Sequence, residues 1–248
     1  MTGQIITKRE GAVLHVTLNR ADKKNAITSD MYRGMADALI LADSDDTIGA
    51  VLITGSGGCF TAGNDVGDFL NGTRDKDGQP GLRFIRTIAG CNTPIVAAVD
   101  GVAVGVGTTL LFHCDLVYAS PSAKFRMPFV DLGLVPEAAS SLLVPLRVGM
   151  AKATEMLMLG EAFGADEAHR LGVINAVVPE GQLVAHGLAM ATRLAAKPRN
   201  AIAQTRRLLR GDRADVLKRI DDEIVLFTAA LQSDDARAAF SAFLSKGK

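Results

Sequence analysis

The sequence predicts an α/β fold with a wound core followed by a helical C-terminal region. Short apolar segments typical of strands alternate with segments of helical periodicity over the first part of the chain. After about Ala138 every predicted element is a helix. The 248 residues are sufficient for one large α/β domain with a helical appendage. Because 48% of the residues are hydrophobic and only 5% are aromatic, we expect an aliphatic core.

Four segments are predicted strands. Residues 13–18 alternate between apolar and polar side chains, which is typical of a half-buried strand. The runs at 49–54 and 95–99 are almost continuously apolar and indicate buried strands, and a further strand is expected at 115–119.

Helical spacing of apolar residues predicts the helices. The first covers about Ser29 to Ala42, with Thr28 or Ser29 as its N-cap. Others are expected at 82–89 and, after a glycine-rich turn, at 108–112. The later helices are predicted at 139–147, 151–159, 165–171, 182–196, 199–209, 213–231 and 234–245. The polar segment Asp68–Pro80 between two of these elements is a candidate mobile loop.

A domain boundary is expected near Pro198, which divides the chain into a core at 1–197 and a C-terminal helical region at 198–248. The last three helices form a tail with apolar faces that need a partner surface. These faces comprise Ile220, Ile224, Phe227, Phe240, Phe243 and Leu244. They could cover the chain's own core or form an interface between subunits.

The charge balance and the cysteines exclude several classes of function. Lysine plus arginine equal aspartate plus glutamate, 27 against 27, so the chain lacks the basic character that nucleic-acid binding requires. The three cysteines have no metal-ligand spacing, and no disulfide framework is expected. No segment has the composition of a transmembrane helix, and the terminal sequences match neither a secretory signal nor a Ser-Lys-Leu address. We therefore expect a cytoplasmic protein without membrane insertion.

Two glycine-bearing turns follow predicted strands and are candidate ligand sites. The first is CFTAGNDV at 59–66, where small residues would let a ligand approach the backbone. The second is DGVAVGVGTT at 100–109, which opens a predicted helix whose first N–H groups suit developing negative charge. Either segment could also be an ordinary turn, and neither is a dinucleotide or phosphate-loop fingerprint.

The first turn, the longer segment PIVAAVDGVAVGVGTTL at 94–110 that contains the second turn, and three other segments resemble the crotonase (enoyl-CoA hydratase/isomerase) superfamily over almost the whole chain. The other segments are LNRADKKNAIT at 18–28, HCDLVYAS at 113–120 and LGVINAVVP at 171–179. The resemblance implies a ClpP-like spiral of ββα turns and C-terminal helices that form a homotrimer or a hexamer, a dimer of trimers. It also implies an acyl-CoA thioester as substrate, with no separate cofactor and no metal.

The resemblance also assigns site residues by position. The backbone N–H groups of Asn64 and Val106 would form an oxyanion hole on the thioester oxygen. The substrate- and CoA-binding residues would be Lys24, Ala26, Ala62, Gly63, Asn64, Asp65 and Val66. Lys24 could equally belong to a solvated loop, and Asp65 could brace its own turn.

The residues at the family's two hydratase glutamates are Thr109 and Phe129, and neither is a carboxylate. Instead, the segment 125–141 resembles the peroxisomal type of delta3,delta2-enoyl-CoA isomerase, in which the glutamate after a proline is the base. That glutamate here is Glu137. In an alternative interpretation, Pro136 begins a helix and Glu137 lies favourably in its first turn. Asp131 is a weaker catalytic candidate.

The predicted function is therefore migration of a 3-enoyl-CoA double bond to the 2-trans position by one glutamate and an oxyanion hole. Hydration, or another reaction of acyl-CoA on the same fold, is the first alternative. A non-catalytic acyl-CoA-binding protein that retains the pocket is the second.

Overall fold

The computed structural model describes residues 3–67 and 79–246. Almost all of the segment Asp68–Pro80, the candidate mobile loop, therefore lies outside the described residues. No helix in the described ranges is both long and apolar enough to cross a lipid bilayer.

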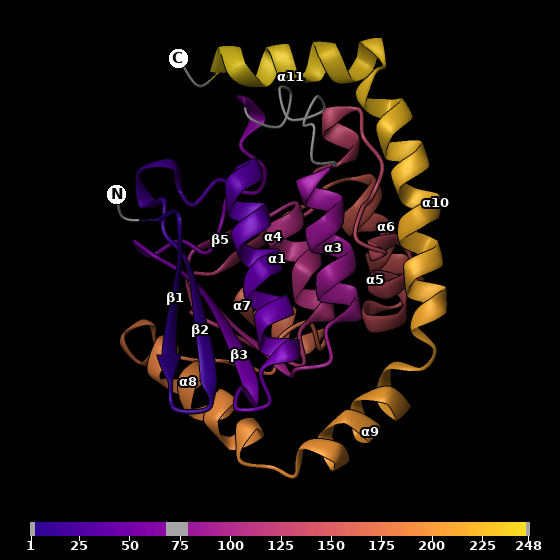
Figure 1. Ribbon diagram of the computed structural model, residues 1–248. Helices are drawn as coiled ribbons and strands as arrows, with labels where there is room; N and C mark the ends of the chain where they lie inside the picture. Colours follow the sequence, from indigo (N-terminus) through magenta and orange to yellow (C-terminus); the bar gives the residue numbers. More distant parts are fainter. Residues whose placement is uncertain (1–2, 68–78, 247–248) are drawn as a thin grey trace.

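A six-stranded sheet is the larger of the two sheets in the described ranges, and its strands β1 to β3 lie side by side in Figure 1. In spatial order its strands are β1 (Ile5–Glu10), β2 (Val13–Leu18), β3 (Ala50–Gly55), β4 (Ile95–Val99), β6 (Leu116–Ala119) and β9 (Ala176–Val177). The β1–β2 pair is antiparallel and every other pair in this sheet is parallel. The predicted strands are confirmed within one residue at each end, whereas β1 and β9 were not predicted.

A second, three-stranded sheet contains β5 (Val102–Val104), β7 (Lys124–Arg126) and β8 (Phe163–Gly164). Only Asp100 and Gly101 separate β4 from β5, so the chain passes directly from the six-stranded sheet into the small one. This passage brings the second glycine-bearing turn to the carboxyl end of the central strands. These two- and three-residue strands were not predicted, because they are too short to show a period.

Alternate residues of the central strands face two helical layers. Val51 and Ile53 belong to the core cluster that packs under α1 (Ser29–Ser44) and α3 (Pro80–Gly90). Ala50 and Leu52 face α8 (Glu180–Ala195) on the other side of the sheet. Burial on both faces explains why β3 and β4 are continuously apolar. Thr28 is the N-cap of α1, with its side chain accepting a hydrogen bond from Met31 N.

The remaining helices agree with the predicted ranges except near residue 108. They are α4 (Val106–Thr109), α5 (Ser140–Val148), α6 (Met150–Met158), α7 (Ala165–Arg170), α9 (Arg199–Arg210), α10 (Arg213–Leu231) and α11 (Asp234–Lys246). The helix expected at 108–112 is a four-residue α4 followed by the 3-10 helix η2 (Leu110–His113), so its predicted start was two residues late. Two other 3-10 helices are η1 (Ala21–Lys23) and η3 (Val130–Leu132).

The C-terminal helices wrap around the outside of the core (Figure 1). Helix α10 runs along one side of the molecule and contacts α3 and α5. Ile220, Phe227 and Phe240 are buried in the main core cluster, so these apolar faces cover the chain's own core. The Phe243 and Leu244 side chains lie outside the described part of the structure. The boundary near Pro198 and the trimer or hexamer remain predictions.

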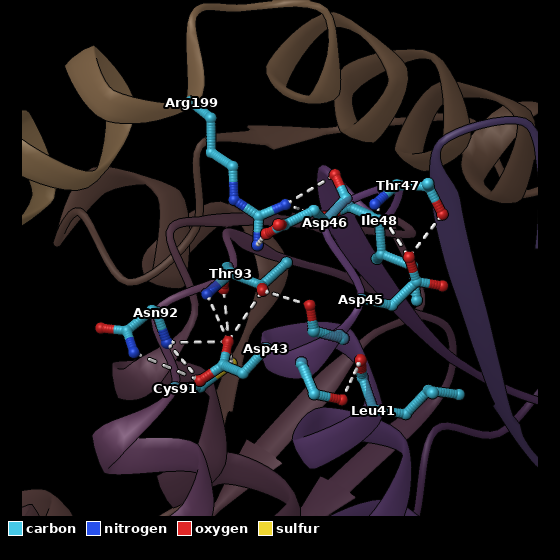
Figure 2. Close-up of polar contacts among 12 residues, drawn as sticks. Leu41, Asp43, Asp45, Asp46, Thr47, Ile48, Cys91, Asn92, Thr93 and Arg199 are labelled. Atoms are coloured by element: carbon cyan, nitrogen blue, oxygen red, sulfur yellow. Dashed lines mark hydrogen bonds and ion pairs between the residues drawn. The ribbon is translucent and has the colours of Figure 1, made fainter.

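The end of α1 is fixed to the start of β4 by one carboxylate (Figure 2). Asp43 accepts hydrogen bonds from Asn92 N at 2.9 Å and from Thr93 N at 2.8 Å. The Thr93 hydroxyl donates a third at 2.7 Å. Burial tends to raise the pKa of Asp43, but these hydrogen bonds and one from the Cys91 thiol outweigh burial and lower it.

Arginine side chains fix α9 to the core. Arg199 donates to the carbonyl oxygens of Asp46 and Ile48 at 2.8 and 3.1 Å (Figure 2). Arg206 is buried and pairs with Asp115 at 2.8 Å, while Asp115 also accepts the β4 backbone N–H of Ile95 at 2.7 Å. These contacts hold α9 against the core just before the chain enters α10.

Candidate active site

The first glycine-bearing turn is fixed by a buried asparagine. Asn25 is fully buried, and its amide donates to Ser56 O at 2.9 Å and to Cys59 O at 2.6 Å. The backbone carbonyl oxygen of Asn25 accepts a hydrogen bond from the Thr61 hydroxyl at 2.7 Å. Asn25 has a left-handed φ of 53°, which asparagine tolerates better than most residues. The turn at 61–64 is therefore held rigidly against residues 20–27.

The two glycine-bearing turns lie against each other. Thr61 N donates to Val102 O at 2.9 Å and Val104 N donates to Thr61 O at 3.1 Å, which pairs the segments like neighbouring strands. A Cβ on Gly63 would lie 2.8 Å from Val104 O, and one on Gly107 would lie 2.4 Å from the Thr61 methyl. Glycine is thus favoured at both positions, because Gly63 lies directly against the opposite backbone and Gly107 against the Thr61 side chain.

The structure brings the two predicted oxyanion donors to this junction. Val106 is the first residue of α4, where backbone N–H groups lack intrahelical partners. Asn64 and Ile27 form an isolated β-bridge. Its hydrogen bonds run from Ile27 N to Gly63 O and from Asp65 N to Ile27 O, so they do not use Asn64 N. Among residues 3–67 and 79–246, neither Asn64 N nor Val106 N has a hydrogen-bond acceptor. Both N–H groups can therefore serve a ligand oxygen.

Glu137 is buried beside the second turn. Its residue is 9% exposed, and the Thr109 hydroxyl lies 3.5 Å from its Oε1. Thr109 is the last residue of α4, which begins with Val106. Burial is the main cause that raises the pKa of Glu137 to about 8, the negative charge of Glu223 adds to it, and the Thr109 hydroxyl opposes it. Such a carboxyl can exchange a proton near neutral pH.

The helix-cap interpretation of Pro136 and Glu137 is wrong. Helix α5 begins at Ser140, and its N-cap is Ala139. Ala138 and Ala139 have φ values of 59° and 55°, which are incompatible with a right-handed helix. Glu137 therefore lies in a turn before the helix. Asp131, on η3, pairs with Arg126 at 2.8 Å, and 47% of its side chain is exposed, so it lacks the burial that raises the pKa of Glu137.

Tyr32, on α1, connects the first turn to Glu137. Its buried hydroxyl donates a short hydrogen bond to Asn64 Oδ1. Burial raises the pKa of Tyr32 well above its ordinary value, and the negative charge of Glu137 adds to that shift. The phenol therefore stays neutral, and it lies within electrostatic reach of both the candidate donor residue and the candidate base.

Glu223, on α10, holds the other side of the Glu137 turn. Its Oε2 accepts Ala139 N at 2.6 Å, and its Oε1 accepts Ser141 N at 3.0 Å and the Ser141 hydroxyl at 2.5 Å. Burial raises the pKa of Glu223, while these donors and Arg219 lower it. Because both Glu223 oxygens accept hydrogen bonds, these contacts favour the ionised form of Glu223, whereas burial and the Glu223 charge favour the protonated form of Glu137.

The predicted CoA-binding residues lie on two adjacent segments. Ala62 N donates to Lys24 O at 2.9 Å, which places these two residues side by side, and the Lys24 side chain is exposed. Arg20 donates to Ala26 O at 3.0 Å and pairs with Asp65 at 2.7 Å. The Asp65 carboxylate thus braces its own loop. Gly63 is buried, while Asn64 and Val66 in the same segment are half-buried, and Val66 packs partly against the core.

Three residues of this arrangement were not predicted as site residues. Asn25, Tyr32 and Glu223 each hold a backbone or a side chain of the site. Glu223 had a recognisable signal, since it lies three residues after Ile220 and four before Phe227 on an apolar helical face. A carboxylate on such a face requires buried hydrogen-bond donors. Asn25 and Tyr32 had no comparable signal, because their partners are distant in the sequence.

Comparison with known proteins identifies the family. The profile of the family described as enoyl-CoA hydratase/isomerase matches residues 8–248. The chain belongs to this enoyl-CoA hydratase/isomerase family, within the crotonase superfamily. The α/β architecture with its C-terminal helical region is that of the family, as the solved structures below show. Enzymes of the enoyl-CoA hydratase/isomerase family act on acyl-CoA, and this is the class of activity of the chain.

Individual members of the enoyl-CoA hydratase/isomerase family are similar over almost the whole chain. Enoyl-CoA delta isomerase 2 of Rattus norvegicus is 34% identical over 98% of the chain, which spans only 63% of the rat protein. The 1,2-epoxyphenylacetyl-CoA isomerase of Escherichia coli strain K12 is 34% identical over 98% of the chain and 95% of its own length. The enoyl-CoA hydratase/isomerase structure from Pseudoalteromonas atlantica T6c is 42% identical and covers 98% of each chain, with a TM-score of 0.95.

Proposed function

We propose that the protein is an enoyl-CoA isomerase that moves the double bond of a 3-enoyl-CoA to the 2-trans position. The observation that carries the proposal is the buried carboxyl of Glu137, which lies beside the junction of two turns that carry unpaired N–H groups. Two relatives named as isomerases of CoA thioesters support it. The substrate is the acyl-CoA itself, and the reaction uses no separate cofactor.

The chemistry needs only one proton carrier. The C2 proton of a 3-enoyl thioester is acidic, because carbonyl and alkene flank it. The Glu137 carboxylate removes this proton, and the electron pair delocalises into a dienolate whose charge resides on the thioester oxygen. The N–H groups of Asn64 and Val106 stabilise that oxygen. Glu137 then returns the proton at C4, which leaves the double bond between C2 and C3 and restores the carboxylate.

The CoA moiety would lie along the segments that contain Lys24, Ala26, Ala62 and Val66. The exposed Lys24 ammonium suits the phosphates of CoA. Small side chains at Ala62 and Gly63 allow the thioester to approach the Asn64 N–H.

Hydration is the second candidate reaction, and it needs a carboxylate free to activate water. Of the two family positions that supply such groups, Phe129 is buried and apolar, and Thr109 donates toward Glu137. Glu223 is already engaged by three hydrogen bonds from 139–141. A non-catalytic acyl-CoA-binding protein would have no need for a buried carboxyl with a pKa near neutrality.

A paired assay tests the proposal. The purified protein is offered a 3-enoyl-CoA and a 2-enoyl-CoA, and conjugation and hydration are followed separately. We expect isomerisation without hydration. In the pH profile of kcat/KM, activity should fall below about pH 8 (the acid limb of the profile), because Glu137 must be deprotonated to act. Glu137→Gln should lower kcat by at least about 10²-fold.

Asp131→Asn is the matched control, because Asp131 is a carboxylate six residues away that pairs with Arg126 at the surface. Its activity should equal that of the wild type. Full activity of Glu137→Gln would show that another group is the base. Hydration as the main reaction, or binding of both thioesters without turnover, would favour one of the alternatives.

A further inference from the structure

The turn between Glu137 and helix α5 adopts a conformation that its residues do not favour. Ala138 and Ala139 both have left-handed φ values, although each carries a Cβ. Consecutive non-glycine residues in this region are unfavourable and persist only where surrounding contacts hold them. This conformation determines the direction of the Glu137 side chain, because Glu137 immediately precedes it and its carbonyl accepts Ser140 N at 3.0 Å.

A carboxylate from a distant helix holds the turn. Ala139, the N-cap of α5, has no side chain that could accept the unpaired N–H groups of the first helical turn. Glu223, which follows Ala139 by 84 residues, takes this role by accepting Ala139 N and Ser141 N. Its negative charge also lies favourably at the N-terminus of the helix. The contacts are buried, with Glu223 only 5% exposed.

The carbonyl side of the turn is held separately. His113 Nε2 donates to Ala138 O at 2.8 Å, and His113 is buried on η2. Arg219, also on α10, donates to the Ser141 hydroxyl at 3.1 Å, and that hydroxyl in turn donates to Glu223. Other elements thus supply the hydrogen-bonding partners on both sides of the turn. Among these partners in the described part of the chain, the only carboxylate comes from α10.

We propose that Glu223 is a positioning residue for the reaction, holding the Ala138–Ala139 turn so that the Glu137 carboxyl lies beside Thr109 and the two unpaired N–H groups. The inference rests on the proposed function, in which Glu137 transfers the proton. Glu223 does not touch the reacting atoms. It makes the active site depend on α10, a helix that packs on the outside of the core (Figure 1).

The same contact has an electrostatic consequence. The groups that act on Glu137 are the Glu223 carboxylate on α10 and the Thr109 hydroxyl on α4, and the Tyr32 phenol on α1 is in turn affected by the charge of Glu137. Arg219 and His113 face the same turn through Ser141 and Ala138. Of these, Glu223 is the anion, so its charge disfavours ionisation of Glu137 and helps to keep the proton there.

The test is Glu223→Gln, which keeps the shape of the side chain but turns one acceptor into a donor facing the backbone N–H groups. We expect kcat for a 3-enoyl-CoA, measured above the acid limb, to fall roughly 10- to 100-fold with little change in KM. The limb itself should move to lower pH, because the repelling charge is removed. The matched control is Asp222→Asn, which removes the neighbouring exposed carboxylate that pairs with Lys218 and should leave kcat unchanged.

A second substitution separates positioning from general stability. Glycine favours the left-handed conformation, so Ala139→Gly in the Glu223→Gln background should restore kcat several-fold. Wild-type kcat in Glu223→Gln would overturn the inference. The inference would also be overturned by a loss of kcat that merely follows the fraction of unfolded protein measured by thermal melting. In that case the acid limb would not shift and Ala139→Gly would not restore kcat.

The proposed function can fail independently of this inference. A wild-type protein that does not isomerise 3-enoyl-CoA overturns the proposed function. In that event the carboxyl of Glu137 is titrated directly by NMR of protein labelled with ¹³C at glutamate carboxyls, its resonance identified by its loss in Glu137→Gln. A lower pKa of this resonance in Glu223→Gln supports the positioning contact, and an unchanged pKa overturns it.

Discussion

At the scale of single residues, the site depends on how one carboxyl is kept ready to exchange a proton. Glu137 is buried beside a second carboxylate, and both conditions raise its pKa to about 8. The hydroxyl of Thr109 opposes them by donating toward Oε1. The residue at position 109 therefore adjusts the fraction of Glu137 that is ionised at neutral pH.

Thr109→Val removes this donor while keeping a β-branched side chain of similar size. We expect the apparent pKa of the acid limb of kcat/KM to rise, since the ionised form of Glu137 accepts this hydrogen bond more strongly than the neutral form does. Activity at pH 7 should fall, and the two proteins should converge well above pH 8. Thr109→Ser, which keeps the hydroxyl, is the control and should follow the wild type. An identical limb in Thr109→Val would contradict the prediction.

At the scale of elements, carboxylates join segments that are distant in the sequence. Asp43 at the end of α1 accepts the backbone N–H groups that precede β4. Asp115 at the start of β6 receives Arg206 and Arg210 of α9. Glu223 on α10 holds the N-terminus of α5. In each case the carboxylate accepts hydrogen bonds from backbone or guanidinium donors of another segment.

Asp43→Asn tests such a connection at a position remote from the site. At pH 7 we expect the free energy of unfolding to fall by about 1–3 kcal/mol, because an amide cannot accept all of these hydrogen bonds. Folding lowers the pKa of Asp43 below its ordinary 3.8, so its contribution is present above that pH and is lost as the pH falls through the folded value. Urea unfolding at several pH values should therefore show a difference that narrows below about pH 4.

The control for this measurement is Asp37→Asn. Asp37 lies on the same helix and pairs with Arg83, and 65% of its side chain is exposed. Surface pairs of this kind contribute little, so its effect should stay within about 0.5 kcal/mol. A constant difference between Asp43→Asn and the wild type from pH 7 to pH 3 would show that the charge is not what stabilises the connection.

At the scale of the whole molecule, the buried Glu137 couples the candidate catalytic group to the stability of the fold. The carboxyl is ionised near pH 4.5 in an unfolded chain but near pH 8 in the folded protein. Between these values the folded state binds the additional proton. The stability associated with this proton is therefore fully present below pH 4.5 and is lost as the pH rises to about 8.

Glu137→Gln removes this titration, because the amide is neutral at every pH. The free energy of unfolding of the variant, relative to the wild type, should increase from pH 5 to pH 9 as measured by denaturant titration. The difference in free energy of unfolding between the two proteins cancels the contributions of groups that titrate in both. Asp131→Asn should show no such trend, because Asp131 is half-exposed. A difference that is flat across this range would mean that Glu137 is ionised at its ordinary pH in the folded protein.

Much of the fold was predictable because it is encoded in local patterns. The run at 95–99 is apolar at every position, and Thr28 precedes a helical period, so both elements could be located without tertiary information. The two-residue strands β8 and β9 could not be predicted, since they exist only through pairing with β7 and β6. The helix start expected at Pro136 was wrong, because Ala138 and Ala139 have left-handed φ values and α5 begins only at Ser140.

The sequence by itself determined the order of elements, the two glycine-bearing turns, the absence of the paired hydratase glutamates and the presence of Glu137. These features depend on residue type and on short spacings. Only the tertiary structure decided that Glu137 is buried, that Glu223 lies behind it and that Tyr32 contacts Asn64. The physical reason is that a pKa and a turn conformation depend on groups that reach the site from elsewhere in the chain. Neighbours in space, not neighbours in sequence, supply the charge and the hydrogen bonds that make this carboxyl a candidate base.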